Sequence, residues 1–323
     1  MTPKLSVVIP VYNEEAGLAA LFGRLYPALD ALAVPYEVIF VDDGSRDRSA
    51  AILKDQYLAR PDVTRVVLFN ANRGQHTAII AGFERVRGER VVTLDADLQN
   101  PPEEIAALLA AMDDGHDYVG GVRATRRDAW WRHAASRAMN RLRERITHIR
   151  MTDQGCMLRA YSRDIVDAVA ASREVSTYIP ALAYTYARSP SEVVVAHEER
   201  AAGESKYSLY KLIRLNFDLV TGFSLVPLQL FSLFGMLVAA GSLLLYAIVV
   251  IQRLLTGDGW AALWDRDILE FFLIGVVLFG VGLVGEYVGR IYQQVRDRPR
   301  YTVRAVLERD ALRESAPVPR ELP

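Results

Sequence analysis

The sequence predicts an α/β protein with a parallel sheet covered by helices, followed by two long apolar helices toward the C-terminus. In residues 1–94, short runs of strand-forming residues alternate with segments whose apolar residues recur at helical spacing. Such alternation is typical of a sheet covered on both faces, which binds ligands beyond the carboxyl ends of its strands. Further along, two apolar stretches are each long enough to cross a bilayer.

The strands and helices of the first part follow one another in a regular order. A first strand, Val7–Ile9, is closed by Pro10, and leucines between Leu18 and Leu32 then recur at helical spacing. Further strands are predicted at 36–41, 64–68 and 91–94, and further helices at 50–58, around Ile79, Phe83 and Val86, and after an N-cap at Asn100. Because polar residues follow these strands, we expect a ligand site along that edge of the sheet.

Charge and cysteine content narrow the classes of function. Residues 1–122 carry a net charge of −7 and residues 123–323 one of +6, which the overall charge of −1 conceals. An acidic front half suits metal binding, and a basic back half suits phosphate or an anionic membrane surface. The single cysteine, Cys156, excludes an internal disulfide and a thiolate metal cluster, and we expect it to be a small buried residue.

The segment Val91–Asn100 ends a strand in three side chains that carry oxygen atoms. If the backbone stays extended, Asp95, Asp97 and Gln99 project from one face at a period of two. Carboxylate and amide oxygens suit Mg²⁺ or Mn²⁺, which usually binds through one or two carboxylates plus substrate phosphates. Two acids one residue apart also occur by chance. This stretch by itself therefore leaves both a cation site and an ordinary acidic turn open.

The sheet region contains neither a Gly-x-Gly-x-x-Gly fingerprint nor a Gly-Lys-Ser/Thr phosphate loop. A dehydrogenase or a P-loop NTPase is therefore disfavoured. A nucleotide would instead be held by residues 10–14, beginning with Pro10, and by Asp42-Asp43, with a metal on its phosphates.

Three motifs in order carry a family resemblance. They are Val-Ile-Pro-Val-Tyr-Asn-Glu-Glu at 8–15, Val-Asp-Asp-Gly-Ser at 41–45 and Leu-Asp-Ala-Asp-Leu-Gln at 94–99. Together they resemble the inverting family 2 glycosyltransferases, which have the Rossmann-like GT-A fold. The resemblance implies that the nucleotide of a sugar donor contacts Tyr12, Glu14 and Asp42, and that its divalent cation is held by Asp95, Asp97 and Gln99.

A basic stretch follows the sheet region. Between Arg123 and Arg150 there are nine arginines and two tryptophans but only two acids. This stretch is a candidate binding site for an anionic acceptor. A solvated helix face or a nucleic-acid patch would show the same composition. The neighbouring apolar stretches favour a lipid interface, so we expect no nucleic-acid partner. By resemblance to the dolichol-phosphate mannose synthases, Arg123 and Arg137 bind the lipid phosphate.

The later motifs resemble those of polyprenyl-phosphate glycosyltransferases, and this resemblance implies roles for three further residues. Asp153 corresponds to an aspartate near the acceptor, and Arg200 and Lys206 to residues that close over the pyrophosphate. Because a phosphate monoester has its second pKa near 6, the acceptor oxygen is already largely ionised at neutral pH. We therefore expect Asp153 to orient the acceptor rather than to act as a strong base, and Asp97 to contribute to catalysis through the metal.

The C-terminal half is expected to bind the membrane. No charged residue occurs between Asp218 and Arg253, and the second apolar stretch runs from about 268 to 290. Basic residues flank the pair at Lys206, Lys211 and Arg214 on one side and at Arg290, Arg296, Arg298, Arg300 and Arg304 on the other. The positive-inside rule then places both ends in the cytoplasm, and the absence of a signal-peptide pattern keeps the front domain there. A buried hairpin of a soluble protein is the alternative.

These features predict four parts. They are a catalytic domain at 1–205, an amphipathic juxtamembrane segment at 206–226, two transmembrane helices within 227–292 (about 227–252 and 268–290), and a C-terminal segment at 293–323 with a disordered tail. Gly282, Gly285 and Gly289 would allow close helix approach, within the hairpin or between subunits of a homo-oligomer. We thus expect a multi-pass protein of the bacterial inner membrane.

Across nearly all of its length, including the segments 74–83, 155–161 and 285–292, the chain is similar to one subgroup of these enzymes. Members transfer 4-deoxy-4-formamido-L-arabinose from UDP to undecaprenyl phosphate, which implies a role in lipid A modification and in resistance to cationic antimicrobial peptides. The chain departs from the expected pattern at Ala71, Arg73 and Gln154. A polyprenyl-phosphate glucosyl- or mannosyltransferase shares every motif. A glycoside hydrolase would need no metal or membrane anchor, and a non-catalytic lipid-binding subunit would not explain the acidic motif.

Overall fold

The computed structural model describes residues 2–123, 149, 151–153, 155–172, 178–198, 228–235, 237–238, 241, 244, 248, 251, 255, 266–295 and 299–309. The chain divides into two compact units. The first comprises residues 1–140, 149–206 and 298–323, and the second comprises 141–148 and 207–297. The C-terminal residues thus belong to the same unit as the N-terminal ones.

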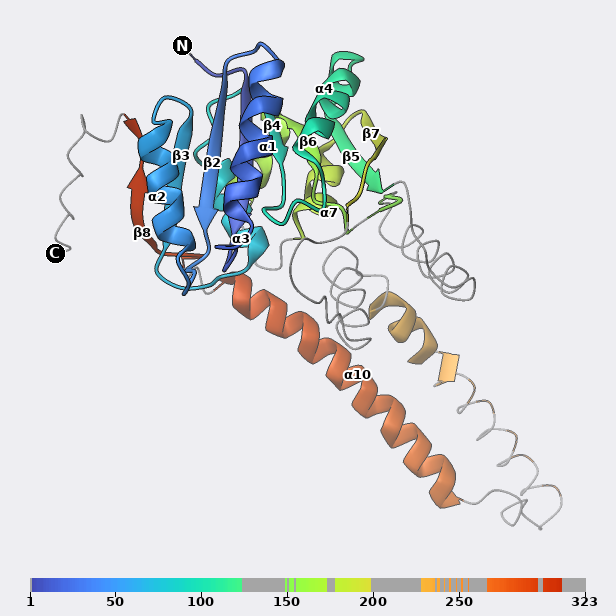
Figure 1. Cartoon of the computed structure of the whole chain (residues 1–323). Coiled ribbons are helices and arrows are strands. Elements are labelled where there is room, and N and C mark those ends of the chain that lie inside the picture. Colours follow the sequence, from blue (N-terminus) through green and yellow to red (C-terminus); the bar gives the residue numbers. More distant parts are fainter. Residues whose placement is uncertain are drawn as a thin grey trace, which may run out of the picture. The chain divides into compact units, whose positions relative to one another are not determined.

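The first unit is an α/β domain in which strands and helices alternate (Figure 1). Its elements are β1 Leu5–Val11, α1 Leu18–Ala31, β2 Tyr36–Asp42, α2 Ser49–Ala59, β3 Thr64–Phe69, α3 Gln75–Phe83, β4 Arg90–Thr93, the 3₁₀ helix η1 Pro102–Glu104, α4 Ile105–Asp113, β5 Tyr118–Arg123, β6 Arg159–Ser162, α6 Arg163–Ala171, α7 Ile179–Tyr186, β7 Pro190–Val195 and β8 Val303–Leu307. The first four strands lie where the sequence predicts them, with ends shifted by one or two residues.

The strands form one mixed sheet in the order β7-β5-β6-β4-β1-β2-β3-β8. Strands β4, β1, β2 and β3 are parallel neighbours, as predicted. The prediction of a wholly parallel sheet is wrong, because β6 pairs antiparallel with β4 and β5, and β8 pairs antiparallel with β3. The carboxyl ends of β1 to β4 therefore still meet at one edge.

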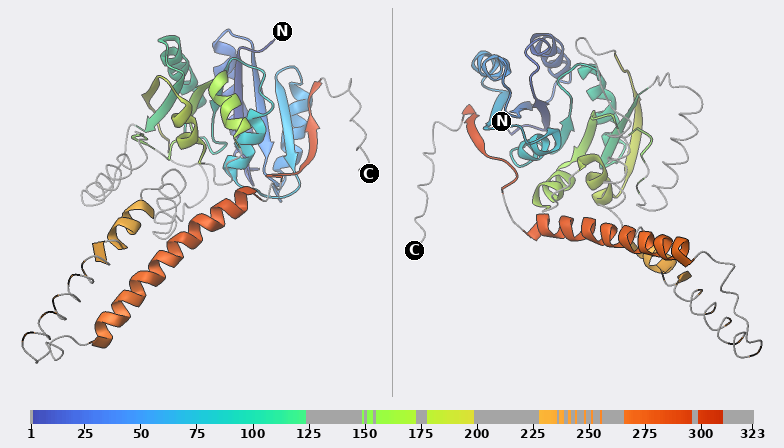
Figure 2. Two further views of the ribbon diagram at one scale, coloured as in Figure 1. Left: turned by 180° about the vertical axis from the view of Figure 1, so that it is seen from behind. Right: turned by 90° about the horizontal axis from the view of Figure 1, so that it is seen from below.

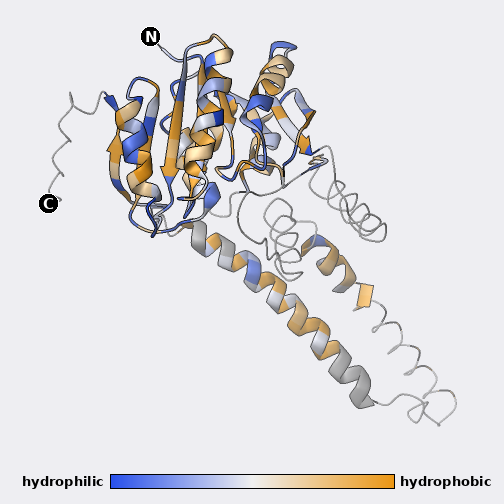
Figure 3. Ribbon diagram, in the orientation of Figure 1, coloured by the Kyte–Doolittle hydropathy of each residue, from blue (hydrophilic) through white to orange (hydrophobic). Residues whose placement is uncertain are grey.

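Helices cover both faces of this sheet (Figure 2). Helices α1, α2 and α4 lie on one face, and α3, α6 and α7 lie on the other. Every residue of β1 is buried, which agrees with its nearly continuous apolar sequence, and Figure 3 shows the same apolar character along β2. A Cβ atom on Gly82 of α3 would come within 2.3 Å of Val8 Cγ1, so glycine permits this helix to approach the sheet closely.

Strand β1 does not end at Pro10 as the sequence predicted. It continues to Val11, with Pro10 paired in register with Val41 of β2. Val8 accepts a hydrogen bond from Leu94 on the side of β4, and Pro10, two residues on, faces the same side beyond the end of that strand. The missing N–H of proline therefore costs no ladder hydrogen bond.

The helix after β4 also begins differently from the prediction. Asn100 is not its N-cap, since the 3₁₀ helix η1 begins at Pro102 and its N-cap is the extended Pro101. Asn100 is buried, and its side-chain oxygen lies 3.5 Å from the Cys156 thiol, which donates to it. Cys156 is buried as expected, and burial raises its pKa to about 11.

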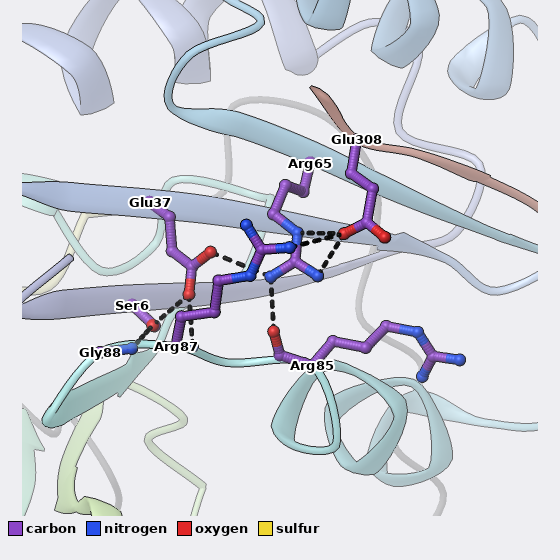
Figure 4. A network of polar contacts seen from close by, with 7 residues as sticks. All are labelled: Ser6, Glu37, Arg65, Arg85, Arg87, Gly88 and Glu308. Carbon is purple, nitrogen blue, oxygen red and sulfur yellow. Dashed lines mark hydrogen bonds and ion pairs between the residues drawn. The ribbon is translucent and has the colours of Figure 1, made fainter. Parts of the chain in front are cut away.

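A buried polar network joins β8 to the rest of the sheet (Figure 4). The Arg65 guanidinium contacts the Glu37 carboxylate at 2.9 Å and the Glu308 carboxylate at 2.5 Å. Glu37 also accepts hydrogen bonds from the Ser6 hydroxyl and from the Arg87 backbone N–H, each at 2.6 Å. Because the charges of this cluster are mutually paired, β8 is held on the domain by ionic contacts as well as by its backbone hydrogen bonds to β3.

The second unit contains α10, Arg266–Val295, a helix of 30 residues and about 45 Å. Apolar residues dominate its described surface (Figure 3). No helix among the described residues meets the combined length and hydropathy criteria for a candidate membrane span. The Phe231 ring lies against Gly280, where a Cβ would come within 2.2 Å, whereas Cβ atoms on Gly282, Gly285 and Gly289 would meet no described atom within 4 Å. Among the described residues of this unit, a close approach of this kind is therefore seen at Gly280.

Candidate active site at the carboxyl edge of the sheet

Hydrogen bonds connect the loops that follow β1 and β2. The Ser45 hydroxyl accepts from the Asn13 backbone N–H at 3.0 Å, and the Ser49 hydroxyl accepts from the Glu14 backbone N–H at 2.9 Å. Asn13 has a positive φ of 54°, which asparagine tolerates better than most residues. The motifs at 8–15 and 41–45 are therefore adjacent in space, as a shared nucleotide site requires.

Asp43 fixes the loop that follows β3. Its carboxylate accepts the backbone N–H of Arg73 at 2.6 Å and that of Gly74 at 2.8 Å. The neighbouring Gly44 has a φ of 68°, and a Cβ there would lie 2.5 Å from the Ala71 carbonyl carbon. The Asp43-Gly44 pair thus sets the distance between the two loops.

Asp42 is the buried acid of this edge. Its Oδ2 accepts the Ser45 backbone N–H at 3.3 Å, while its Oδ1 is buried and has no hydrogen-bond partner among the described residues. Burial raises the pKa of Asp42, and the Ser45 hydrogen bonds oppose that shift. Asp42 is one of the residues that line a pocket of about 220 Å³ between the β2 and β3 loops. A buried acceptor without a partner, on a residue that lines a pocket, is suited to an N–H from a ligand.

The other predicted nucleotide residues surround this edge. Pro10 is buried inside β1, Tyr12 is 41% exposed just beyond it, and Glu14 is half-buried at the start of the following loop. Tyr12 can therefore stack on or cover a ligand, whereas Pro10 shapes the strand beneath it.

The acidic motif lies in a turn and not in an extended strand. Strand β4 ends at Thr93, and Leu98 has a φ of 59°, so the premise of a period-two strand is wrong. Buried and half-exposed residues nevertheless alternate along this turn. Ala96, Leu98 and Asn100 are buried, and Asp95, Asp97 and Gln99 are half-exposed. The predicted ligands thus still share the outer side of the loop.

Contacts order this acidic loop. The Gln75 amide donates to Asp95 Oδ1 at 2.5 Å, and Asp97 Oδ1 accepts the Gln99 backbone N–H at 3.1 Å. The Gln99 carbonyl accepts the backbone N–H of Glu198, which follows β7. No cluster of three His, Cys, Asp or Glu side chains able to hold a metal occurs in the described ranges. Two half-exposed carboxylates and an amide oxygen nevertheless match the donor atoms that Mg²⁺ or Mn²⁺ prefers.

Arg123 and Asp153, both predicted to serve the acceptor, bind each other. Arg123 Nε lies 2.6 Å from Asp153 Oδ2, and Nη2 lies 2.8 Å from Oδ1. The Asp153 side chain is 4% exposed and the Arg123 side chain 21% exposed. In this geometry both carboxylate oxygens are engaged by the guanidinium, and the guanidinium is held at the end of β5.

A fully buried arginine supports that pair. Arg159 donates to the Tyr118 hydroxyl, the Cys156 carbonyl and the Asp153 carbonyl at 2.5–2.8 Å. A Cβ on Gly120 would lie 2.8 Å from the Arg159 guanidinium, so glycine leaves room for it. Sequence reasoning gave Arg159 no role, although two adjacent glycines in a strand signal a close approach.

Several predicted residues lie outside the described residues: Arg137, Arg200 and Lys206, together with Gln154, the segment 206–226 and much of the predicted first membrane helix. Sequence reasoning also treated Arg304 only as a charge that flanks the second apolar stretch. In the structure Arg304 lines the Asp42 pocket.

Comparison with known proteins assigns this site to a class. Residues 6–170 match the family model described as Glycosyl transferase family 2. The chain belongs to glycosyl transferase family 2 and is a glycosyltransferase, and its α/β domain has the GT-A fold. The resemblance carried by the three motifs is thereby confirmed.

Two relatives extend the comparison. An undecaprenyl-phosphate 4-deoxy-4-formamido-L-arabinose transferase of Aeromonas hydrophila subsp. hydrophila is 48% identical over 305 residues, which cover 94% of each chain. Among solved structures, mannosyl-3-phosphoglycerate synthase from Rubrobacter xylanophilus aligns with a TM-score of 0.50 at 12% identity, over 68% of this chain and 72% of that one. The second likeness shows the fold only.

Proposed function

We propose that this glycosyltransferase transfers 4-deoxy-4-formamido-L-arabinose from its UDP donor to undecaprenyl phosphate, with inversion at the sugar carbon. The observation that carries the proposal is the 48% identity to the Aeromonas hydrophila transferase over 94% of both chains. At 94% coverage the alignment includes the apolar C-terminal half, where a lipid acceptor would be met. In a cell the product would serve lipid A modification and resistance to cationic antimicrobial peptides.

The donor would bind at the carboxyl edge of β1 to β4. Asp42 offers a buried acceptor to the base, and Tyr12 and Glu14 lie on the adjoining loop. Asp95, Asp97 and Gln99 would hold a divalent cation, Mg²⁺ or Mn²⁺, on the outer side of their turn. The ion would neutralise charge on the departing UDP.

The acceptor phosphate would bind at Arg123, with Arg137 as a second cation. A phosphate monoester is largely ionised at neutral pH, so its oxygen needs alignment more than deprotonation. Asp153 supports this arrangement because its carboxylate holds the Arg123 guanidinium by two hydrogen bonds. The role proposed for Asp153 is therefore to position Arg123.

The remaining proposals concern location. Residues 227–252 and 268–290 would form a transmembrane hairpin in the bacterial inner membrane, with the catalytic domain and both termini in the cytoplasm and the hairpin available for homo-oligomer contacts. The apolar surface of α10 and the basic residues on both sides of the hairpin support this topology.

The decisive experiment is a product assay. The purified full chain would be incubated with undecaprenyl phosphate and, separately, with UDP-4-deoxy-4-formamido-L-arabinose, UDP-glucose and GDP-mannose, and the lipid product would be weighed by mass spectrometry. We expect product from the first donor only, with none after chelation or in Asp97→Asn. The exposed Asp114→Asn serves as the matched control and should retain activity. Product from glucose or mannose donors, or full activity with chelator, would contradict the proposal.

The proposed membrane topology is tested by labelling introduced cysteines. The single native cysteine, Cys156, is buried and should not react with the label. A membrane-impermeant maleimide applied to intact spheroplasts should label Thr256→Cys in the loop between the apolar stretches. It should label Ser315→Cys near the C-terminus only after lysis. Labelling of both variants in intact spheroplasts, or of neither before lysis, would overturn the hairpin.

A further inference from the structure

The pocket beside Asp42 contains one residue from the far end of the sequence. Asp42 and Ser45 line it from the β2 loop, Asn70 and Ala71 line it from the β3 loop, and Arg304 lines it from β8. The donor-side pocket is therefore not complete within the N-terminal residues that match the family model.

Arg304 owes its place to a β-bulge. In the ladder between β3 and β8, Leu68 pairs with Ala305, whereas the next residue, Phe69, pairs with Val303. Arg304 is therefore the extra residue of the bulged strand. Bulges redirect side chains and recur beside functional sites. Here the redirected side chain belongs to the pocket wall.

The segment that carries this bulge is held at both ends. On one side, the Tyr301 ring stacks on Phe69 with centroids 4.6 Å apart and planes at 14°, and the Tyr301 hydroxyl lies 3.0 Å from the Arg85 guanidinium. On the other side, Glu308 pairs with Arg65 at 2.5 Å (Figure 4). The backbone of Arg304 is thus positioned independently of any ligand.

The pocket lining combines a hydrogen-bond donor, the Arg304 guanidinium, with a hydrogen-bond acceptor, the Asp42 carboxylate. The Asp42 residue is only 2% exposed, and its Oδ1 has no partner among the described residues, which is unfavourable for a buried acceptor. The positive charge of Arg304 partly opposes the rise that burial causes in the pKa of Asp42. A ligand that gives an N–H to Asp42 and a carbonyl oxygen to Arg304 would satisfy both groups.

We propose that Arg304 binds the uracil base of the donor, donating to a ring carbonyl while Asp42 Oδ1 accepts the adjacent ring N–H. Uracil presents one ring N–H between two carbonyl groups, and the guanidinium presents several N–H donors in a fixed plane. This inference rests on the proposed function, since it takes the donor to be a uridine nucleotide. It makes the strand that follows the second apolar stretch a part of the donor site.

The test measures ligand affinity of the full chain in detergent by isothermal titration with UDP, using uridine and inorganic pyrophosphate as competing ligands. For Arg304→Ala we expect UDP and uridine to bind at least tenfold more weakly and pyrophosphate to bind as in the unmodified chain. Arg304→Lys should recover part of the loss. Arg309→Ala is the matched control, because Arg309 is an exposed arginine just beyond β8 that pairs with Asp62 away from the pocket.

Each other outcome is decisive. Unchanged uridine affinity in Arg304→Ala, or a loss confined to pyrophosphate, overturns the base contact. A lowered melting temperature with unchanged UDP affinity of the folded protein makes Arg304 structural and also overturns it. Failure of the unmodified chain to bind UDP contradicts the proposed function itself, which separates the two failures.

Discussion

Replacing Asp153 by asparagine tests whether Asp153 positions Arg123 or acts as a catalytic base. The change keeps the size of a side chain that is 4% exposed but removes the charge that holds Arg123 through contacts of 2.6 and 2.8 Å. Asparagine can accept only one of these two bonds. A lost hydrogen bond to a charged group is worth about 1.5–3 kcal/mol. If that free energy is needed to align Arg123 in the transition state, kcat/KM should fall by about 10- to 150-fold.

The assay is kcat/KM for undecaprenyl phosphate between pH 6 and 9 at saturating donor, with UDP affinity as the measure of folded protein. We expect the acidic limb of the profile to persist in Asp153→Asn, since the acceptor phosphate itself titrates near pH 6. Arg123→Gln should lose a similar factor, and the double variant should lose little more, because both changes break one interaction. Independent, multiplicative losses, or abolished turnover together with loss of the acidic limb, would refute the positioning role.

Three further predictions follow from the fold. Glu37→Gln should lower the free energy of unfolding by about 3 kcal/mol in a urea titration, because it leaves the buried Arg65 without one of its carboxylate partners. Glu103→Gln, which breaks an exposed ion pair, should lower it by under about 1 kcal/mol. Equal losses in the two variants would contradict this prediction. Burial lowers the pKa of His76 to about 4, so protonation of the unfolded chain should remove at most about 3 kcal/mol of stability as the pH falls from 6.5 to 4. His76→Gln should lack that dependence, and an identical pH profile would count against it. Gly44→Ala should weaken UDP binding at least tenfold because its Cβ would strike the next loop, while Gly115→Ala, which also has a positive φ but open space around it, should bind UDP normally; weakened binding in both would assign the effect to backbone strain.

The location of the site was predictable because it follows from local pattern. Alternating strands and helices determine that β1 to β4 are parallel, and parallel strands bring their carboxyl ends to one edge. Asp42 is the last residue of β2, and Asp95 lies two residues beyond the end of β4. The sequence therefore predicted their shared edge without any long-range information.

The backbone of the acidic motif was not predictable from the same reasoning. A positive φ at Leu98 is rare for leucine, and here Leu98 is buried in the core of the domain. Tertiary packing, which periodicity does not contain, thus overrides the preference for an extended strand.

Contacts between distant residues were the other omission. Arg65 and Glu308 are separated by 243 positions, and Val303–Leu307 is too short to show a clear strand period. The pairing of Arg123 with Asp153 likewise depends on the segment before β6 lying beside β5. Sequence analysis assigned both residues to one function but could not show that they bind each other.

The position of β8 has a consequence for biosynthesis. The ribosome makes this strand after the other strands of the sheet and after both apolar stretches, yet it pairs with β3, which would otherwise be an edge strand. A nascent chain that stops before β8 would leave β3 as the edge strand and Arg65 without its contact to Glu308. Truncated products should therefore be recognisable to proteases, and a β3 strand paired with β8 would mark chains whose synthesis has passed the apolar segments.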